Sequence, residues 1–565
     1  MRNVSIKNRE NSLFIVFSWI AALGLFCLGM WQFHNTEFYS HFGLVPGGRG
    51  DPRLVTALME YFHHSLHGPG SLVSPAFYYP AKGCMGYADV FLSYALFYDW
   101  LRNGGWDVFT SLQICVFVTD ILNYLCCFLF LWRGLRQGVL ASALGSFFFA
   151  YNAPKFNQIS HVQLQCLFWF PLVLWCLVEW AGKRRGMKPS HAFGWLSLAG
   201  LLFNLQLYSA FYVSWFFVFW SFLFLLLAFL FSPTREFLWN LVRCYRFPLM
   251  GGGGVTLAGL IPFLIIYLPV IRNFGGKNYS EILMMLPDAH SFLWMGPRHA
   301  WWGWLWDKCP AIQAYPVEGE VRMGFGLVVL IAWAVLTALA VKSIRKKGSM
   351  RADFLPQGLP LQFTALVVLA TTLFYLLAFQ FPGGHSLWHL VYYLFPGGQS
   401  IRAVSRCAVF LALPMAIAFT IVFQAGLNKV MALKDGSSRW LGLLILLFPA
   451  GLMAYEQTAF PPTPAFDKMW ELNRLEYLSQ KIPAGTKAFY AALAPGLPYS
   501  ATDIQIDAMM LSSVRGIPTL NGYSGENPSQ WQLYVVRSPK YEEHVQEWIK
   551  LKGIQEPVFR LEIDH

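Results

Sequence analysis

The sequence predicts an all-α integral membrane protein, a polytopic bundle of about eleven transmembrane helices. Three observations support this fold class. The chain of 565 residues is 56% hydrophobic and only 13% charged, which is too apolar for a soluble enzyme of several domains. Apolar windows of about 20 residues recur along it. The basic residues cluster in short segments between these windows, so membrane topology accounts for the net charge of +12 and no nucleic-acid partner is needed.

The predicted spans begin close to the N-terminus and end where the chain becomes polar. The first window has no small-residue cleavage site, so we expect a retained span and not a removable signal. The expected spans cover residues 11–33, 107–132, 137–152, 164–181, 191–208, 211–231, 248–271, 323–341, 361–380, 407–426 and 440–458.

Basic residues fall on one side of these spans at every crossing. By the positive-inside rule that side is cytoplasmic, and the N-terminus lies on it. The residues concerned are Arg2, Lys7, Arg9, Arg133, Arg136, Lys183, Arg184, Arg185, Lys188, Arg235, Arg243, Arg246, Lys342, Arg345, Lys346, Lys347, Arg351, Lys429, Lys434 and Arg439.

The opposite, exoplasmic side receives the long segments and a polar tail. In the tail, "LEYLSQKIPAGTKAFYAAL" indicates helix, turn and strand, and "YEEHVQEWIKLKG" indicates a helix that ends at Gly553. We therefore expect a transmembrane domain over residues 1–458 and a small mixed α/β exoplasmic domain over residues 459–565. The long exoplasmic segments are residues 34–106, 151–163, 272–322 and 381–406.

Cysteines and nucleotide-binding motifs add little. Only Cys84 and Cys309 lie in exoplasmic segments, where a disulfide between them is one option; the other cysteines are most simply packing residues. The chain has no GxxxxGK[ST] phosphate loop, no HExxH, no paired CxxC and no GxGxxG after a strand. We therefore expect an activated substrate to arrive through the membrane, as a lipid.

The stretch "GRGDPRLVTALMEYFHHSLHGPG" at residues 48–70 contains a turn and a helix-forming segment, which a simple loop between two membrane spans does not require. Asp51 before Pro52 has the form of a helix N-cap, and an amphipathic helix then continues to Gly68. A second helix follows at "YADVFLSYALFYDWLRNGG", with Asp89 near its start. Asp51 is either a cap or an exposed base that a substrate can approach between the flanking glycines. Asp89 is either an N-cap or a second acid.

This first exoplasmic segment, with its Gly-Asp turn and two juxtamembrane helices, resembles that of the integral-membrane glycosyltransferases of the GT-C fold. "GDPRLVTALMEY" looks like their Gly-Asp motif. The resemblance implies that Asp51 is the catalytic base and that the donor is a sugar linked to polyprenyl or dolichyl phosphate. Several families of this fold have a second acid after the Gly-Asp, where this chain has Pro52 and Arg53. That departure puts a metal-binding acid pair in doubt and leaves a divalent metal as an option only.

Two further stretches resemble bacterial members of the fold. "NAPKFNQISHVQLQCLFWFPL" implies that His161 and Gln163 lie at the site, and "FPGGQSIRAVSRCAVF" implies the same for Arg402 and Arg406. The tail stretch "LNGYSGENP" also resembles this group. Sugar transfer from a lipid phosphate needs a base for the acceptor proton and positive charge for the leaving phosphate. An arginine pair four residues apart on one helical face would make a phosphate fork.

Each of these residues also has a structural interpretation. The arginines would reach lipid headgroups, and His161 would make hydrogen bonds at the start of a span. Arg53 is also a candidate substrate-binding residue. Asp120, inside the second span, stays unassigned, since polar residues of neighbouring spans could satisfy it.

We therefore predict a glycosyltransferase of the bacterial plasma membrane. It would transfer a hexosyl or pentosyl group with inversion, from a polyprenyl-phosphate donor to a glycan, lipid or protein acceptor on the periplasmic side. Its partners would be the donor, the acceptor and membrane lipids, with no nucleic acid. The alternatives are a transporter or flippase of lipid-linked glycans, for which no repeated halves are visible, and a non-enzymatic envelope assembly factor.

Overall fold

The computed structural model describes residues 2–68, 70–182, 187–313, 319–345, 361–460 and 463–564. Within them the fold is helical, and each of the eleven apolar windows contains a helix. The predicted multi-pass helical fold is therefore confirmed. Seven helical segments within this part of the chain are long and apolar enough to cross a membrane by length and composition, so the count of eleven spans stays a prediction. Those segments are Leu13–Phe33, Val108–Gly134, Val162–Ala181, Phe211–Leu230, Thr234–Phe274, Val404–Met431 and Gly436–Glu456.

Helix α19 packs against α6, α10, α17 and α20 within the bundle. Every residue from Cys407 to Ala418 in α19 is buried, as expected for a helix packed on all sides. By contrast, apolar side chains of α1 and α20 point outward, where they suit a lipid environment. The bundle helices are α1 (Arg2–Phe33), α5 (Val108–Leu129), α6 (Val139–Ala150), α8 (Trp169–Gly182), α9 (Pro189–Ser209), α10 (Phe211–Leu230), α11 (Ser232–Phe274), α16 (Leu327–Arg345), α17 (Leu361–Ala378), α19 (Cys407–Met431) and α20 (Gly436–Glu456).

Two features of the bundle differ from the sequence prediction or fall outside it. Helix α11 joins two helices across a kink at Tyr245, and only its second part corresponds to the span expected at 248–271.

Several basic residues on the predicted cytoplasmic side lie outside the described residues. These are Lys183, Arg184, Arg185, Lys346, Lys347 and Arg351.

Short helices and strands fill the segments between the spans. The two juxtamembrane helices predicted in the first long segment are present as α3 and α4, and α3 is followed by Gly68 as expected. Strands β2 and β3 form an antiparallel hairpin. These elements are α2 (Asn35–Tyr39), β1 (Leu44–Pro46), α3 (Asp51–His67), α4 (Leu92–Asn103), α7 (Ala153–Asn157), α12 (Tyr279–Leu283), α13 (Ala289–Leu293), α14 (Ala300–Lys308), α15 (Pro310–Gln313), β2 (Gln380–Phe381), β3 (His385–Ser386) and α18 (Trp388–Leu394).

The tail is a mixed α/β unit built on two parallel strands, β5 and β6. The helix, turn and strand predicted from its sequence are present, and Gly553 ends α23 in a left-handed conformation with φ of 63°. The elements of the tail are β4 (Ala465–Asp467), α21 (Lys468–Gln480), β5 (Ala488–Leu493), α22 (Ala501–Arg515), α23 (Tyr541–Lys552) and β6 (Val558–Ile563).

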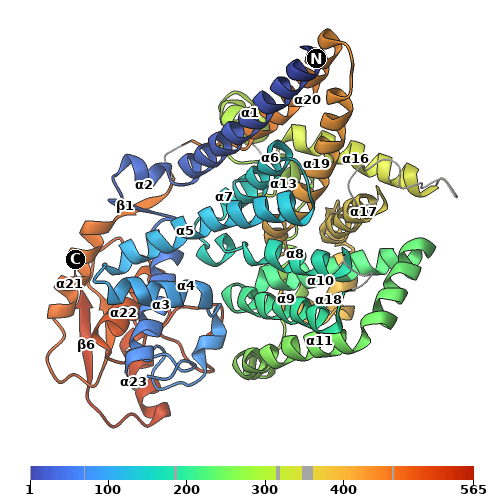
Figure 1. The fold of residues 1–565 in the computed structure, drawn as a ribbon. Helices are drawn as coiled ribbons and strands as arrows, with labels where there is room; N and C mark the ends of the chain where they lie inside the picture. The colour runs from blue at the N-terminus through green and yellow to red at the C-terminus, as the bar shows by residue number, and fades with distance from the viewer. Residues whose placement is uncertain are drawn as a thin grey trace.

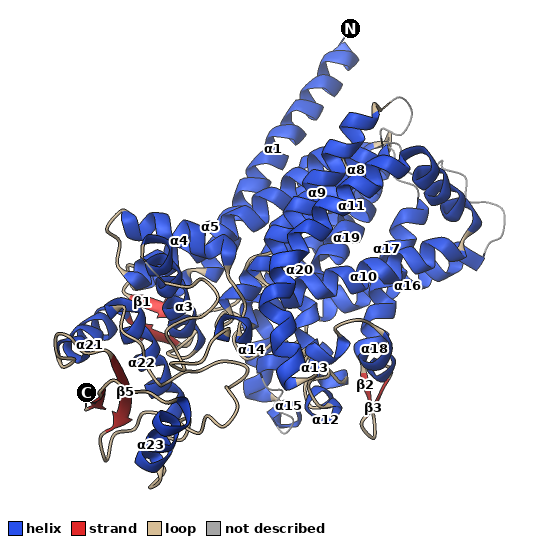
Figure 2. Ribbon diagram, turned by 90° about the horizontal axis from the view of Figure 1, so that it is seen from below, coloured by secondary structure: helices blue, strands red, loops and turns tan. Residues whose placement is uncertain are grey.

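The tail and the first long segment share one core. Strand β4 pairs antiparallel with β1, and α22 packs on α3, so the two regions lie side by side in both views (Figures 1 and 2). The N–H of Tyr78 donates to the carbonyl of Asn521 at 2.9 Å, and that of Thr519 donates to Ala76 at 2.9 Å. Hydrophobic residues from both regions form a single buried cluster. We call this unit the loop-and-tail layer, residues 44–106 with residues 463–564.

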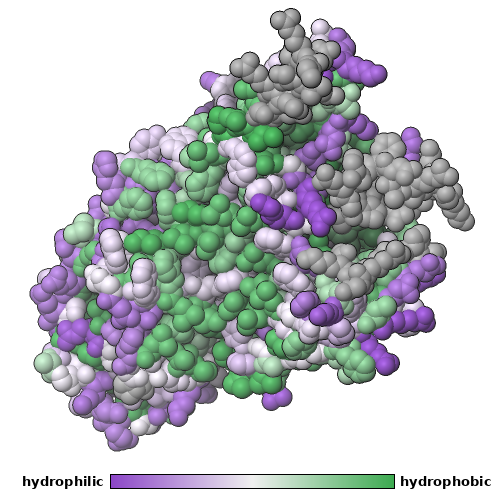
Figure 3. Space-filling model, in the orientation of Figure 1, coloured by the Kyte–Doolittle hydropathy of each residue, from purple (hydrophilic) through white to green (hydrophobic). Residues whose placement is uncertain are grey.

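Surface hydropathy separates the two regions. On the face shown in Figure 3, hydrophobic residues form a broad field across the middle, and hydrophilic residues gather over the part that Figure 1 shows as the loop-and-tail layer.

Cys84 and Cys309 are both free thiols, so the optional disulfide between them is not formed.

Candidate functional site

Asp51 does not cap the helix that it begins. It is the first residue of α3, the N-cap position is taken by Gly50, and no side chain caps this end. The cap interpretation is therefore wrong. The carboxylate, 31% exposed, instead contacts His161, with Oδ2 3.2 Å from Nε2. Gly47 permits this approach, because it adopts φ of +97° and an added Cβ would lie 2.9 Å from Ser160 Cα.

His161 joins Asp51 to a carboxylate that the sequence did not single out. Its Nε2 lies 2.9 Å from Oε1 of Glu320, in the short 3₁₀ turn Gly319–Val321. The same nitrogen lies 2.8 Å from Nη2 of Arg406. Because Nε2 carries at most one proton, it either donates to one of the carboxylates or accepts from the guanidinium. His161 can therefore exchange hydrogen-bond partners without moving.

Glu320 and Arg406 form a two-point ion pair. Nε and Nη2 of Arg406 donate to the two carboxylate oxygens of Glu320 at 3.1 and 2.9 Å. Burial acts to raise the pKa of Glu320, but the hydrogen bond from His161 and the charge of Arg406 outweigh it and hold the pKa below its ordinary value. Ser405 Oγ also donates to the Glu320 carbonyl at 2.7 Å, which ties this turn to the start of α19. We call Asp51, His161, Glu320 and Arg406 the open cluster.

Arg402 lies beside the cluster but not on a helix. The 3₁₀ turn Val404–Arg406 and α19 both begin after it, so the predicted fork on one helical face is wrong. Its backbone N–H donates to Tyr212 Oη at 3.2 Å, and the ring of Tyr212 faces Arg406 with 5.5 Å between guanidinium carbon and ring centre. The side chain of Arg402 is exposed. It is thus the more accessible of the two cations.

The tail also reaches the site. Tyr523, in the stretch "LNGYSGENP", has its pKa raised by burial and by the negative charge of Asp51, while Arg402 acts in the opposite direction. Its hydroxyl is therefore within electrostatic reach of both groups. Tyr523 was missed as a site residue although its motif was noticed.

Asp89 serves a different helix from the one predicted. Helix α4 begins at Leu92 with Phe91 as its N-cap, and Oδ1 of Asp89 instead accepts from the N–H of Phe211, at the start of α10, at 2.9 Å. Burial raises the pKa of Asp89 to about 6, opposed by this hydrogen bond and by the charge of Arg406. Asp89 thus lies near the open cluster, as a cap of α10.

Gln163 and Arg53 are placed less favourably for binding. Gln163 follows His161 in a 3₁₀ turn, and its amide oxygen is buried without a hydrogen-bond donor among the described residues. Arg53 is fully buried, with Nη2 2.8 Å from Glu471 Oε1 and a second ion pair to Asp507. This burial leaves its guanidinium no side open to a substrate. In place of the predicted substrate contact, Arg53 clamps α3 to the tail.

Comparison with known proteins gives the fold. No protein-family model matches the chain, and no curated protein matches its sequence. The apo oligosaccharyltransferase of Archaeoglobus fulgidus matches in structure with a TM-score of 0.51 at 13% identity, covering 95% of this chain and 69% of that one. The chain has the GT-C fold. The resemblance stated from sequence is therefore confirmed at the level of the fold.

Two further structural matches, both with lower TM-scores, are to a single protein. Apo ArnT from Cupriavidus metallidurans matches with a TM-score of 0.42 at 13% identity, covering 98% of this chain and 93% of that one. The same protein bound to undecaprenyl phosphate matches with a TM-score of 0.39 at 11% identity, covering 90% and 85%.

A divalent metal does not fit the open cluster. The oxygens of Asp51 and Glu320 and the nitrogen of His161 are metal donors by type, but Nη2 of Arg406 lies within 2.9 Å of both Glu320 Oε1 and His161 Nε2. A fixed positive charge on the shared donors opposes a second cation. The chemistry proposed below uses no metal.

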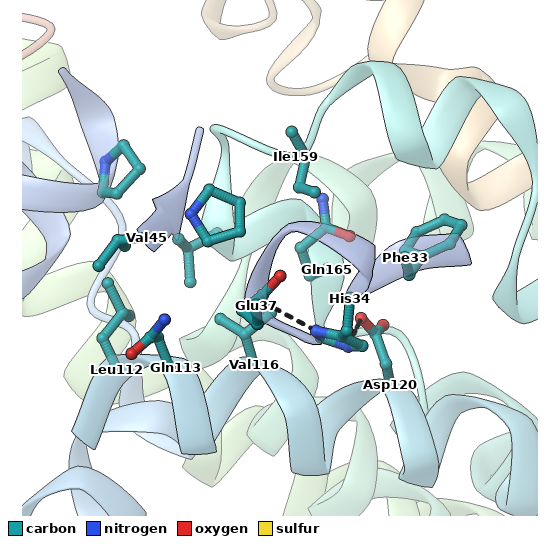
Figure 4. A pocket seen from close by; sticks show the side chains of 13 residues that line it. Phe33, His34, Glu37, Val45, Leu112, Gln113, Val116, Asp120, Ile159 and Gln165 are labelled. Carbon is teal, nitrogen blue, oxygen red and sulfur yellow. Dashed lines mark hydrogen bonds and ion pairs between the residues drawn. The ribbon is translucent and has the colours of Figure 1, made fainter. Parts of the chain in front are cut away.

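A second charged cluster contributes His34, Glu37 and Asp120 to the lining of a cavity of about 30 Å³, room for about one water (Figure 4). His34 contacts Glu37 through Nδ1 at 3.0 Å and Asp120 through Nε2 at 3.2 Å, and Asp120 also pairs with Lys155. Burial acts to lower the pKa of His34, but the two carboxylates raise it to about 9. We call His34, Glu37, Asp120 and Lys155 the sealed cluster. Within it, His34 and Lys155 are the charge partners of Asp120, the residue left unassigned from the sequence.

Proposed function

We propose that the protein is a membrane glycosyltransferase that transfers a sugar from a polyprenyl-phosphate donor to the hydroxyl group of a glycan, lipid or protein acceptor. One observation carries this proposal. Asp51, a partly exposed carboxylate on a GT-C fold that caps no helix, contacts His161 in a cluster with two cations beside it. Acceptor activation and stabilisation of a leaving phosphate need these two kinds of group in one place.

Asp51 acts as the general base. The acceptor hydroxyl donates a hydrogen bond to the carboxylate oxygen that His161 does not engage. As the acceptor oxygen bonds to C1 of the sugar, its proton passes to Asp51, and the bond from C1 to the phosphate oxygen breaks. The electron pair leaves with the polyprenyl phosphate. Attack opposite the leaving group inverts C1, for a hexosyl or a pentosyl group alike.

Arg406 and Arg402 have different roles in stabilising the leaving phosphate. Arg406 is held by Glu320 through two hydrogen bonds, so it supplies a fixed positive field and keeps His161 in place. Arg402 is exposed, and among the described residues its guanidinium has no ion-pair partner. We assign Arg402 the direct contact with the donor phosphate, because its five N–H donors remain available.

The reaction takes place on the exoplasmic side, the periplasm of a bacterium, with the N-terminus in the cytoplasm. Support comes from the origin of the site residues. Asp51, His161 and Glu320 come from three segments that the basic-residue pattern assigns to that side, and Arg406 closes the fourth. Four segments assigned to the exoplasmic side meet in one cluster, as a shared side requires.

Purified Asp51→Asn protein tests the proposal. Asparagine keeps the shape and a hydrogen-bond acceptor but cannot take the proton, so transfer from a polyprenyl-phosphate sugar should fall about 10²–10⁴-fold. Asp435→Asn, an exposed cap at the start of α20, is the matched control and should retain full activity. Near-normal transfer by Asp51→Asn would remove Asp51 as the base. Absence of transfer by the wild-type protein with a panel of such donors would favour an assembly factor.

A further inference from the structure

The C-terminal ends of the two juxtamembrane helices carry a group of metal-ligand side chains away from the open cluster. His63 and His67 lie one turn apart on α3, and Asp99 faces them from α4. We propose that these three residues form a binding site for Zn²⁺. This proposal does not depend on the glycosyltransferase activity.

The distances within the group suit a metal ion. Asp99 Oδ1 lies 2.6 Å from His63 Nδ1 and 2.9 Å from His67 Nε2, and all three ligand atoms lie within 4.8 Å of one another. A tetrahedral Zn²⁺ with bonds of about 2.0–2.1 Å needs ligand atoms about 3.3 Å apart, so small side-chain movements would admit the ion. Two histidines at i and i+4 present their rings on one helical face, the spacing that helical zinc sites use.

The ligand types select zinc over the common hard cations. Calcium and magnesium prefer sets made only of oxygen, whereas two imidazoles and one carboxylate suit Zn²⁺. The amide of Asn103 lies 3.1 Å from Asp99 Oδ2 and 3.3 Å from His67 Nε2, where it can orient the carboxylate from the outer shell. The fourth ligand would be a water, because His67 is 52% exposed and the site opens to solvent.

The electrostatics of the three groups agree with this geometry. Burial acts to raise the pKa of Asp99, but hydrogen bonds and charge interactions with His63 and His67 outweigh it and lower the pKa. A carboxylate that stays ionised between two imidazoles is ready to accept a cation.

The position of the site indicates a structural role. His63 is twelve residues beyond Asp51 on the same helix, about 18 Å along its axis, so the ion lies too far away to touch the reacting atoms. It would join α3 to α4 and fix the far end of the helix that presents Asp51. Binding should therefore raise the melting temperature of the protein more than it changes the rate.

Zinc binding by full-length protein in detergent tests this directly. The protein is purified with a tag that lacks histidine, stripped with a chelator and titrated with Zn²⁺. We expect one high-affinity equivalent per chain in the wild type, and at least about a 100-fold loss of affinity in His63→Ala and in His67→Ala, since even outer-shell changes cost 10–100-fold. Co²⁺ in place of zinc should give the visible absorption of a tetrahedral site, absent from both variants.

His64→Ala is the matched control, because His64 is 45% exposed on the same helix and its Nε2 pairs with Glu60 and not with Asp99. It should bind zinc as the wild type does. If His63→Ala does not fold, His67→Ala decides the question alone, since its side chain is half exposed. Equal zinc affinity in the wild type and His67→Ala, or no zinc bound by the wild type, would overturn the proposal.

Discussion

The open and sealed clusters have the same charge composition and different surroundings. Each combines an aspartate, a glutamate, a histidine and one lysine or arginine. In the open cluster the two carboxylates are 31% and 29% exposed, and an exposed arginine stands beside them. In the sealed cluster the carboxylates are at most 4% exposed. Composition alone therefore does not identify a reactive site, because only the open cluster has groups left to meet a substrate.

The difference is one of exposure to solvent. In the sealed cluster the carboxylates are held by His34 and Lys155, and changes there should appear as lost stability. In the open cluster Asp51 is 31% exposed and its one ion pair among the described residues is with His161, so changes there should appear as lost rate. The predictions below test this division, from the largest expected effect to the smallest.

Asp120→Asn should destabilise the protein strongly. It leaves the fully buried ammonium of Lys155 without its counter-charge, and breaking a buried ion pair costs about 3–5 kcal/mol. We expect the melting temperature in detergent to fall by roughly 3–4 °C for a chain of 565 residues. Asn123→Ala, which removes a neutral hydrogen-bond partner of Asp120, is the milder comparison. An unchanged melting temperature in Asp120→Asn would show that the sealed cluster does not support the fold.

Stability should also fall as the pH rises from 6.5 to 9. The pKa of His34 is raised in the folded state to about 9 from an unfolded value of about 6.5, so its contribution is complete below pH 6.5 and is lost as the pH passes 9. The contribution is about 3 kcal/mol, from the difference of the two pKa values. Melting curves across this range, compared with those of His34→Gln, measure it. A wild type whose stability is as flat as the variant's would contradict the charged His34.

Glu320→Gln should slow transfer without unfolding the protein. The change removes the negative charge that orients Arg406 and His161, and hydrogen bonds to charged groups are worth about 1.5–3 kcal/mol, or roughly 10–100-fold in rate. The loss should appear in kcat more than in KM. Glu281→Gln, in the same inter-span segment, is the control. If both variants keep the wild-type kcat, Glu320 belongs to the scaffold only.

Arg402→Ala should weaken donor binding. Removing one exposed cation from the phosphate should raise the KM for the polyprenyl-phosphate donor about tenfold, and Arg402→Lys should restore it only in part because lysine lacks the planar fork. Arg272→Ala, an exposed arginine at the end of α11, is the matched control. A KM unchanged in Arg402→Ala would assign this residue to lipid headgroups.

Sequence patterns predicted what is local and missed what is distant. Hydropathy located a helix in every window, and the Gly-Asp turn, a pattern of adjacent residues, made Asp51 a candidate. Glu320 carries no local signal, since a lone acid in an irregular turn becomes notable only when Arg406, 86 residues later, reaches it.

The starting points and caps of helices also could not be predicted from the sequence. Asp89 caps a helix that starts 122 residues further on, so no local pattern contains its partner. The fork expected of Arg402 and Arg406 required a helix, and α19 begins one residue after Arg406. The tail was predicted as a domain of its own. In the structure it packs with the first long segment as the loop-and-tail layer, and the partners of Arg53 accordingly lie in α21 and α22.

The central claim is that the open cluster carries the chemistry and the sealed cluster the fold. It is tested most directly by measuring the transfer rate per folded molecule in Asp51→Asn, with its melting temperature measured on the same preparation. We predict a melting temperature within about 2 °C of the wild type, since Asp51 caps no helix, and a rate lower by about 10²–10⁴-fold. A normal rate, or a rate loss explained by unfolding as in Asp120→Asn, would contradict the account.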